Sequence, residues 1–124
     1  MKLHRDNPYT QNRIRAYGPG EIRINETGYH QSLIVGPRAV ELENLPVNLA
    51  SLEPRHLDRL LAHAPEIILL GTGAQLIFPS RELLLRVQER GVGMEVMDTG
   101  AACRTFNVLL AEDRMVVALL LLDD

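Results

Sequence analysis

The sequence lacks tryptophan, and aromatic residues make up only 4% of its 124 positions. A hydrophobic core must therefore be built from leucine, isoleucine and valine. A single cysteine excludes an internal disulfide and fits a reducing cytoplasm. The longest apolar run, Met115–Leu122, is far shorter than the ~18 residues of a membrane span. Because the N-terminus also lacks the hydrophobic segment of a secretory signal, we expect a cytoplasmic protein without a membrane span.

The chain also has only a small excess of negative over positive charge. The formal net charge of −3 argues against general binding to nucleic acid or to anionic membranes. With 46% hydrophobic and 23% charged residues, the composition is typical of a globular protein. We predict one domain over residues 13–124, preceded by a loose polar tail at residues 1–12.

The first third of the chain has the pattern of short antiparallel strands. Ile14–Tyr17 and Glu21–Ile24 alternate apolar and polar residues around a Gly-Pro-Gly turn, which predicts a hairpin. A further strand is expected at Tyr29–Val35, and Arg38–Glu43 alternates again. These segments predict an antiparallel N-terminal portion.

The middle of the chain alternates helices with buried strands. A helix is predicted to begin near Ser51, with an apolar stripe over Leu57–Ala64 at helical spacing. The wholly apolar Ile67–Leu70 predicts a strand covered on both faces. A second helix, capped by Ser80, and a strand at Val92–Met97 follow. This strand–helix–strand unit is expected to be parallel.

Two interpretations fit the segment after Asp98. Thr105–Leu110 has the composition of a strand that forms a hairpin with Met115–Leu121. The apolar residues between positions 102 and 110 also recur at helical spacing, and Thr99 is a good N-cap. We choose a third helix followed by a buried final strand, which gives an α/β fold.

Two Thr-Gly turns follow predicted parallel strands. Gly71-Thr72-Gly73 and Asp98-Thr99-Gly100 would open at the same sheet edge, where α/β sheets tend to bind ligands. Leu76 stands where a dinucleotide fingerprint needs a third glycine, and no Gly-Lys-Ser/Thr follows. Asp98-Thr99-Gly100 matches the aspartic protease triplet, but that chemistry needs two such triplets. The turns therefore either bind a ligand or merely end their strands.

The predicted third helix carries two further candidates. Arg104 would hold an anion beside the helix N-terminus, together with the turn residues, or would pair with Asp98 or Glu95. Cys103 would be either a helix-start thiolate or a small buried hydrophobe, and its apolar neighbours favour burial. The candidate ligand site is Gly71, Thr72, Gly73, Asp98, Thr99, Gly100 and Arg104.

Histidine spacing gives no metal site. His56 and His63 are seven positions apart on the predicted helix. That spacing separates them by about 10.5 Å along the helix axis, too far to share a metal ion. His4 and His30 are isolated in the sequence. We therefore predict no metal and no cofactor.

The second half of the chain resembles a known family. Ile67–Gly73, Gly93–Thr99 and Ala101–Leu109, followed by Glu112, Arg114 and the apolar tail, are similar to the Mth938-type domain family. This family includes a mitochondrial respiratory complex I assembly factor and an adipogenesis-associated protein. The resemblance implies a three-layer α/β fold with a mixed five-stranded central sheet whose last strand is antiparallel to the others. Asp113 departs from the family, in which glycine is common at that position.

Two functional hypotheses follow. The absence of a nucleophile–base pair, metal set or cofactor motif favours a non-enzymatic interaction or assembly module with a protein partner. The family resemblance links such a module to respiratory-complex biogenesis. The alternative is a protein, binding or enzymatic, that takes a small anionic metabolite at the two Thr-Gly turns.

Overall fold

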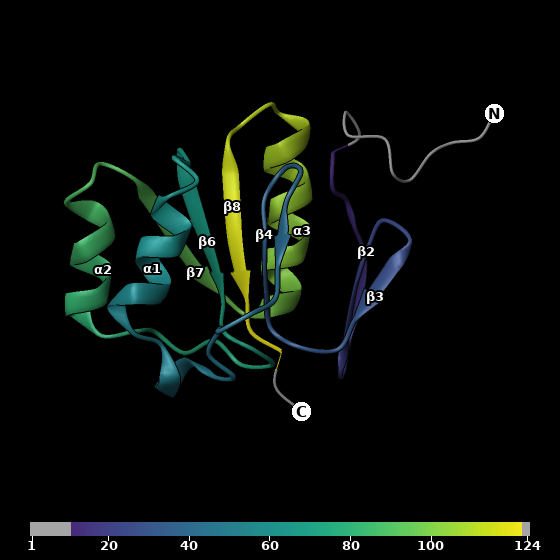
Figure 1. The fold of residues 1–124 in the computed structure, drawn as a ribbon, viewed down its shortest axis with the longest axis horizontal. Coiled ribbons are helices and arrows are strands. Elements are labelled where there is room, and N and C mark those ends of the chain that lie inside the picture. The colour runs from purple at the N-terminus through teal and green to yellow at the C-terminus, as the bar shows by residue number, and fades with distance from the viewer. Residues whose placement is uncertain (1–10, 123–124) are drawn as a thin grey trace.

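A five-stranded mixed sheet forms the centre of the computed structural model, which describes residues 11–122 (Figure 1). The strand order is β5-β4-β8-β6-β7. Strands β6, β7 and β8 are mutually parallel, and β4 pairs antiparallel with both β8 and β5. The strands are β4 (Leu33–Val35), β5 (Val40–Glu41), β6 (Ile67–Gly71), β7 (Gly93–Met97) and β8 (Val116–Leu120).

The direction of the last strand corrects the expectation drawn from the family resemblance. Strand β8 is parallel to β6, from Ile67 beside Val116 to Gly71 beside Leu120. The helix that precedes β8 carries the chain back to the starting edge of the sheet, so β8 enters in the direction of β6. The strand that runs against this group is β4, from the N-terminal part of the chain.

The N-terminal portion forms a separate three-stranded antiparallel sheet of β1 (Ile14–Gly18), β2 (Glu21–Ile24) and β3 (Thr27–Tyr29). The predicted hairpin is confirmed as the β1–β2 pair. The single strand predicted at Tyr29–Val35 is wrong, because β3 ends at Tyr29 and β4 begins only at Leu33. The chain leaves the small sheet between these two residues and enters the central one.

The predicted loose tail falls largely outside the described residues, which begin at position 11. Within the described part, Asn12 is already bonded to the fold. Its backbone N–H donates to the Pro37 carbonyl at 2.6 Å, and its side-chain amide donates to the carbonyls of Gly36 and Ala39.

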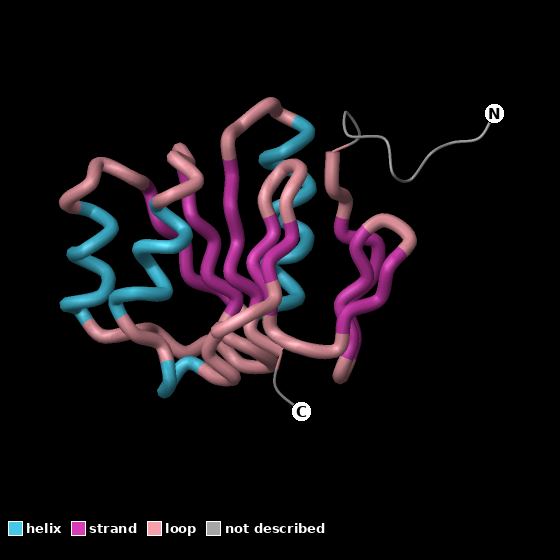
Figure 2. The backbone as a smooth tube through the Cα atoms, viewed as in Figure 1, coloured by secondary structure: helices cyan, strands magenta, loops and turns pink. Residues whose placement is uncertain are grey.

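Helices cover both faces of the central sheet, which gives three layers (Figures 1 and 2). Helices α1 (Pro54–Leu61) and α2 (Arg81–Gln88) lie on one face. Helix α3 (Thr99–Ala111) lies on the other, and the small sheet packs against it through β1. The helix expected near Ser51 begins later, at Pro54, because residues 49–51 form a separate 3-10 turn, η1.

Alternation along the buried strands divides the core between the two faces. Ile68 and Leu70 pack toward α1 and α2, whereas Leu69 packs toward α3. Phe106, on α3, is fully buried among this second group. The choice of a helix over a hairpin for this segment is therefore right, and the aliphatic core is as expected.

Candidate functional site

The two Thr-Gly turns lie together at one sheet edge and are bonded to each other. The Thr99 N–H donates to the Gly73 carbonyl at 2.9 Å, and the Gly73 N–H donates to Thr99 Oγ1 at 2.8 Å. The Thr99 hydroxyl in turn donates to the Leu121 carbonyl at 2.7 Å. Because these groups bond within the protein, they are not presented to a ligand.

Close packing explains the first glycine of the pair. A Cβ atom on Gly71 would lie 2.9 Å from the Thr99 Cα, which is backbone and has little room to move. The end of β6 therefore approaches the start of α3 as closely as it does because position 71 carries no side chain. At this point the sheet edge is filled rather than open.

The N-cap of α3 is Asp98, so the prediction of Thr99 as the N-cap is wrong. Asp98 Oδ1 accepts from the Ala101 N–H at 2.8 Å, while the Thr99 side chain is used to join the turns. A carboxylate at this position supplies the negative charge that a helix N-terminus favours. The same carboxylate repels an anionic ligand that approaches the helix N-terminus.

Arg104 lies apart from the joined turns, in a small cleft of about 160 Å³ between β1 and α3. Arg15 lines this cleft as well, along with Tyr17 and Gly100. Both arginine side chains are exposed, and neither side chain forms an ion pair or a hydrogen bond with another residue of the range 11–122. The expected pairing of Arg104 with Asp98 or Glu95 is therefore absent there, and its ligand role stays a prediction.

Cys103 is buried beneath this cleft. Burial in an apolar environment raises the pKa of its thiol from about 9 to about 12, and the nearby positive charge of Arg104 opposes this only in part. At neutral pH the side chain is a protonated thiol packed in the core, which agrees with the buried alternative.

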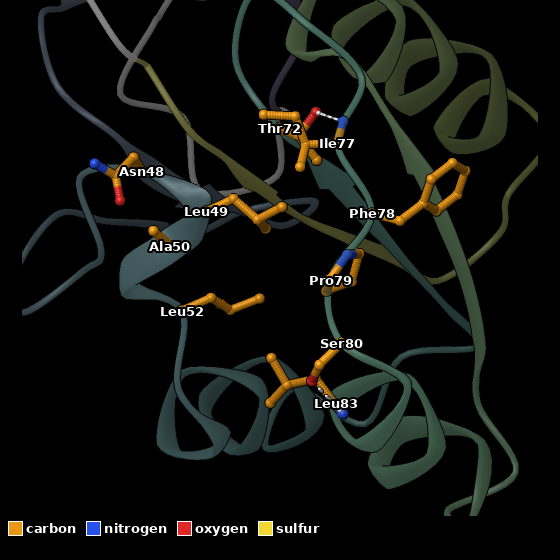
Figure 3. Close-up of a pocket in the computed structure, with 10 residues that line it drawn as sticks. All are labelled: Asn48, Leu49, Ala50, Leu52, Thr72, Ile77, Phe78, Pro79, Ser80 and Leu83. Atoms are coloured by element: carbon orange, nitrogen blue, oxygen red, sulfur yellow. Dashed lines mark hydrogen bonds between the residues drawn. The ribbon is translucent and has the colours of Figure 1, made fainter.

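A larger groove, of about 520 Å³, opens beside Thr72 at the same sheet edge (Figure 3). The β6–α2 loop, residues 72–80, forms one wall, and η1 together with Leu52 forms the other. In Figure 3 the side chains of Leu49 and Leu52 point across the groove toward the loop, and Leu83 of α2 closes one end. The lining residues are Asn48, Leu49, Ala50, Leu52, Thr72, Ile77, Phe78, Pro79, Ser80 and Leu83.

Local hydrogen bonds hold the loop in place. The Thr72 hydroxyl donates to the Gln75 carbonyl at 2.6 Å and accepts from the Ile77 N–H at 3.1 Å. The Ser80 hydroxyl accepts from the Leu83 N–H and caps α2. These contacts fold the loop back on itself and leave its apolar side chains pointing outward.

Exposed apolar side chains extend the groove onto the surrounding surface. Phe78 is 66% exposed and Val47 is 68% exposed, and Leu76 and Ile77 are about half exposed. No charged residue occurs in residues 44–52 or 67–80. We call these four side chains, with the groove, the apolar edge. Val47 and Leu76 directly precede the lining residues Asn48 and Ile77 in the chain, and exposed apolar side chains beside a groove mark an interaction site more often than scattered ones do.

The apolar edge was not among the sites predicted from the sequence. The signal available was the triplet Leu76-Ile77-Phe78 between a glycine turn and Pro79, outside any strand or helix pattern. Three consecutive apolar side chains in a loop are not directed into the core by a strand or helix, so some of them are expected to be exposed.

Two kinds of feature are absent from residues 11–122. Histidine, cysteine, aspartate and glutamate side chains in this range form no group of three or more that is able to hold a metal ion. No helix in it combines the length and the apolar character that crossing a membrane requires.

Comparison with known proteins adds a family and several relatives. Residues 14–121 match the family described as "Protein of unknown function (DUF498/DUF598)". A "13 kDa major membrane protein" of Francisella tularensis is 32% identical over 87% of this chain and 89% of its own. The zebrafish "NADH dehydrogenase [ubiquinone] 1 alpha subcomplex assembly factor 3" is 35% identical over 87% of this chain. The chain spans only 63% of that assembly factor's length.

Solved structures agree on the fold. A Bordetella parapertussis protein superimposes with a TM-score of 0.86 at 34% identity, over 94% of this chain and all of the other. A Bordetella pertussis protein described as a Mth938-like domain gives a TM-score of 0.79 at 31% identity, over 98% of this chain and 92% of its own. The resemblance to the Mth938-type family is thereby confirmed.

Proposed function

Because the chain belongs to the DUF498/DUF598 family of proteins of unknown function, which includes Mth938-like domains, we propose that it is a non-enzymatic protein-binding module that assists the assembly of a multi-subunit complex. The observation that carries this proposal is the apolar edge. Val47, Leu76, Ile77 and Phe78 leave large apolar side chains in water beside a groove. A protein partner that covers them would gain hydrophobic stabilisation.

The names of relatives supply the candidate complex. Fish and frog relatives named as assembly factor 3 of NADH dehydrogenase are 35% and 37% identical to this chain. Identity at this level supports a shared fold and an assembly role, and the membrane-bound NADH dehydrogenase is the first complex to test. The cytoplasmic location expected from the sequence stays a prediction.

Deleting the gene for this chain in its own organism tests the proposal. Native gels of its membranes are expected to show less fully assembled NADH dehydrogenase and more partial complexes. Tagged chain, purified after cross-linking, is expected to recover subunits from those partial complexes. An unchanged amount of assembled enzyme, with no subunit recovered, would contradict the proposal.

A second candidate function rests on the paired arginines. Arg15 and Arg104 converge on one small cleft, and two guanidinium groups suit a phosphate or carboxylate. If anionic metabolites bind there, they raise the melting temperature of the protein, and Arg104→Ala removes that shift. An unchanged shift in Arg104→Ala would exclude this arginine from the site. The Asp98 carboxylate near the cleft makes this the weaker candidate.

A further inference from the structure

We propose that the groove of the apolar edge binds an uncharged, apolar segment of the partner protein, with one or more of its side chains inserted between Leu52 and Ile77. This inference rests on the proposed function and adds the chemical class of the partner. It is carried by the shape of the groove, by the state of its polar groups, by its charge, and by the apolar surface around it.

The groove has the size and lining of a binding site for side chains. Its volume of about 520 Å³ falls within the range of about 300–1,000 Å³ that ligand pockets occupy. Leu49 and Leu52 form one wall, Ile77 and Pro79 the other, and Leu83 closes an end (Figure 3). Leu52 and Pro79 are buried, so each wall includes a side chain that is packed into the fold.

The side-chain oxygens of the lining already accept hydrogen bonds within the protein. Thr72 Oγ1 both donates and accepts within the loop, and Ser80 Oγ accepts from the start of α2. Asn48 Oδ1 accepts from both the backbone N–H and the hydroxyl of Ser51. A metabolite rich in hydrogen-bond donors would therefore lose bonds to water and find these side-chain acceptors already occupied, which disfavours binding.

The absence of charged side chains in the groove disfavours ligands that carry a charge. The two uncharged stretches are bounded by Glu43 and Glu53 and by Glu66 and Arg81. No cationic side chain lines the groove, so the carboxylate of a fatty acid has no partner there. The stretches also lack the clustered lysine and arginine residues that draw proteins to anionic membrane surfaces. An occupant that matches this site is uncharged where it makes contact.

The apolar surface continues beyond the groove, and this favours a macromolecule. Phe78 and Val47 are both about two-thirds exposed, and in Figure 3 the Phe78 ring points away from the cavity. A small ligand would fill the groove and leave these side chains in water. A partner segment that inserts a side chain and also covers Phe78 would bury both, as an amphipathic helix does in an apolar groove.

A synthetic peptide tests the inference directly. We would titrate the 15N-labelled chain with a peptide of about 18 residues, with leucines at i, i+3, i+4 and i+7 and a polar face of glutamine and serine. A second peptide with serine in place of every leucine is the control ligand. Amide resonances of Leu49, Leu52, Ile77 and Leu83 are expected to shift with the first peptide only.

A matched pair of variants locates the site. Phe78→Asp is expected to weaken peptide binding about tenfold or more, by removing apolar contact and placing a charge at the rim. Val108→Asp introduces the same charge at an apolar residue that is 55% exposed on α3. It is expected to bind the peptide within about twofold of the unmodified chain. Both variants change exposed positions, and their amide spectra report whether they are folded.

Several outcomes would overturn the inference. These are equal binding by Phe78→Asp, resonance shifts confined to other surfaces, and binding of neutral phosphatidylcholine vesicles in place of the peptide. Shifts of the same resonances with protein concentration alone would identify a second copy of the chain as the occupant. If Phe78→Asp fails to bind the peptide but still recovers complex subunits after cross-linking, the inference fails while the proposed function stands.

Discussion

The two phenylalanines of the chain occupy opposite environments at the two faces of the central sheet. Phe106, in the middle of α3, has 0% exposure and packs between the central sheet and the small N-terminal sheet. Phe78, in the loop between β6 and α2, is 66% exposed beside the groove. The α3 side of the molecule is thus closed, whereas the α1–α2 side ends in an open apolar edge.

This difference separates stability from binding. A buried phenylalanine contributes a few kcal/mol to folding through the area it removes from water, and an exposed one contributes almost none. Isolated exposed apolar residues are common in soluble proteins, but Phe78 has Leu76, Ile77 and Val47 exposed with it. Such a group gains its hydrophobic stabilisation only when something else covers it.

The largest expected effect is on the closed side. Phe106→Ala should lower the free energy of unfolding by about 3–5 kcal/mol, because it removes a fully buried ring and leaves a cavity. Urea denaturation followed by circular dichroism measures this. Val108→Ala, on the exposed side of the same helix, should stay within about 0.5 kcal/mol of the unmodified chain. A loss in Phe106→Ala no larger than that in Val108→Ala would show that the Phe106 ring does not fill the core in solution.

The next effect concerns the hydroxyl that joins the two Thr-Gly turns. Thr99→Val keeps the shape of the side chain but removes the bonds to the Gly73 N–H and the Leu121 carbonyl. The buried Gly73 N–H would then lack an acceptor, which should cost about 1–3 kcal/mol of unfolding free energy. Thr105→Val is the matched control on the same helix and should change stability by less than about 0.5 kcal/mol. Equal stabilities for the two variants would contradict the structural role of Thr99.

The sequence predicted much of the closed side because local and long-range signals agree there. Apolar residues at helical spacing identified α3, and the repeated Thr-Gly pair identified two turns at one sheet edge. The sequence did not distinguish Asp98 from Thr99 as the N-cap, because both residue types cap helices well. Only the structure shows that the Thr99 hydroxyl is used elsewhere.

The open side was missed because exposure depends on long-range packing. Leu76, Ile77 and Phe78 look like core residues in the sequence, and nothing local shows that bonds to Thr72 turn their backbone outward. The opposite wall, Leu49 and Leu52, comes from a segment more than 20 residues earlier in the chain. A groove formed by two irregular segments has no periodic pattern to reveal it.

Cys103 is expected to make stability depend on pH only in alkaline solution, so its effect near neutral pH is smaller than those above. Burial raises the pKa of its thiol to about 12 in the folded protein, compared with about 9 for an exposed thiol. The unfolded chain therefore loses this proton first, and stability falls as pH rises from about 9 toward 12, by up to about 1.4 kcal/mol per pH unit. Below pH 9 the thiol makes no pH-dependent contribution.

The measurement compares the unmodified chain with Cys103→Ala between pH 8 and pH 10.5. Titration of every other group affects both proteins alike, so the difference in their unfolding free energies isolates the thiol. That difference should shrink above pH 9, and thiol reagents should modify the folded protein slowly at neutral pH. Rapid modification at pH 7, or a difference independent of pH, would show that Cys103 is accessible and that the α3 side is less closed than the structure indicates.

The smallest expected effect on stability is at Phe78, and it tests the comparison most sharply. Phe78→Ser should change the free energy of unfolding by less than about 0.5 kcal/mol, because its ring makes little contact with the rest of the fold. Phe106→Ala, measured by the same urea titration, removes a ring of the same size. A loss above about 2 kcal/mol in Phe78→Ser would mean that this ring packs onto the fold in solution. The apolar edge would then be closed in the free protein, and an incoming segment would first have to displace Phe78.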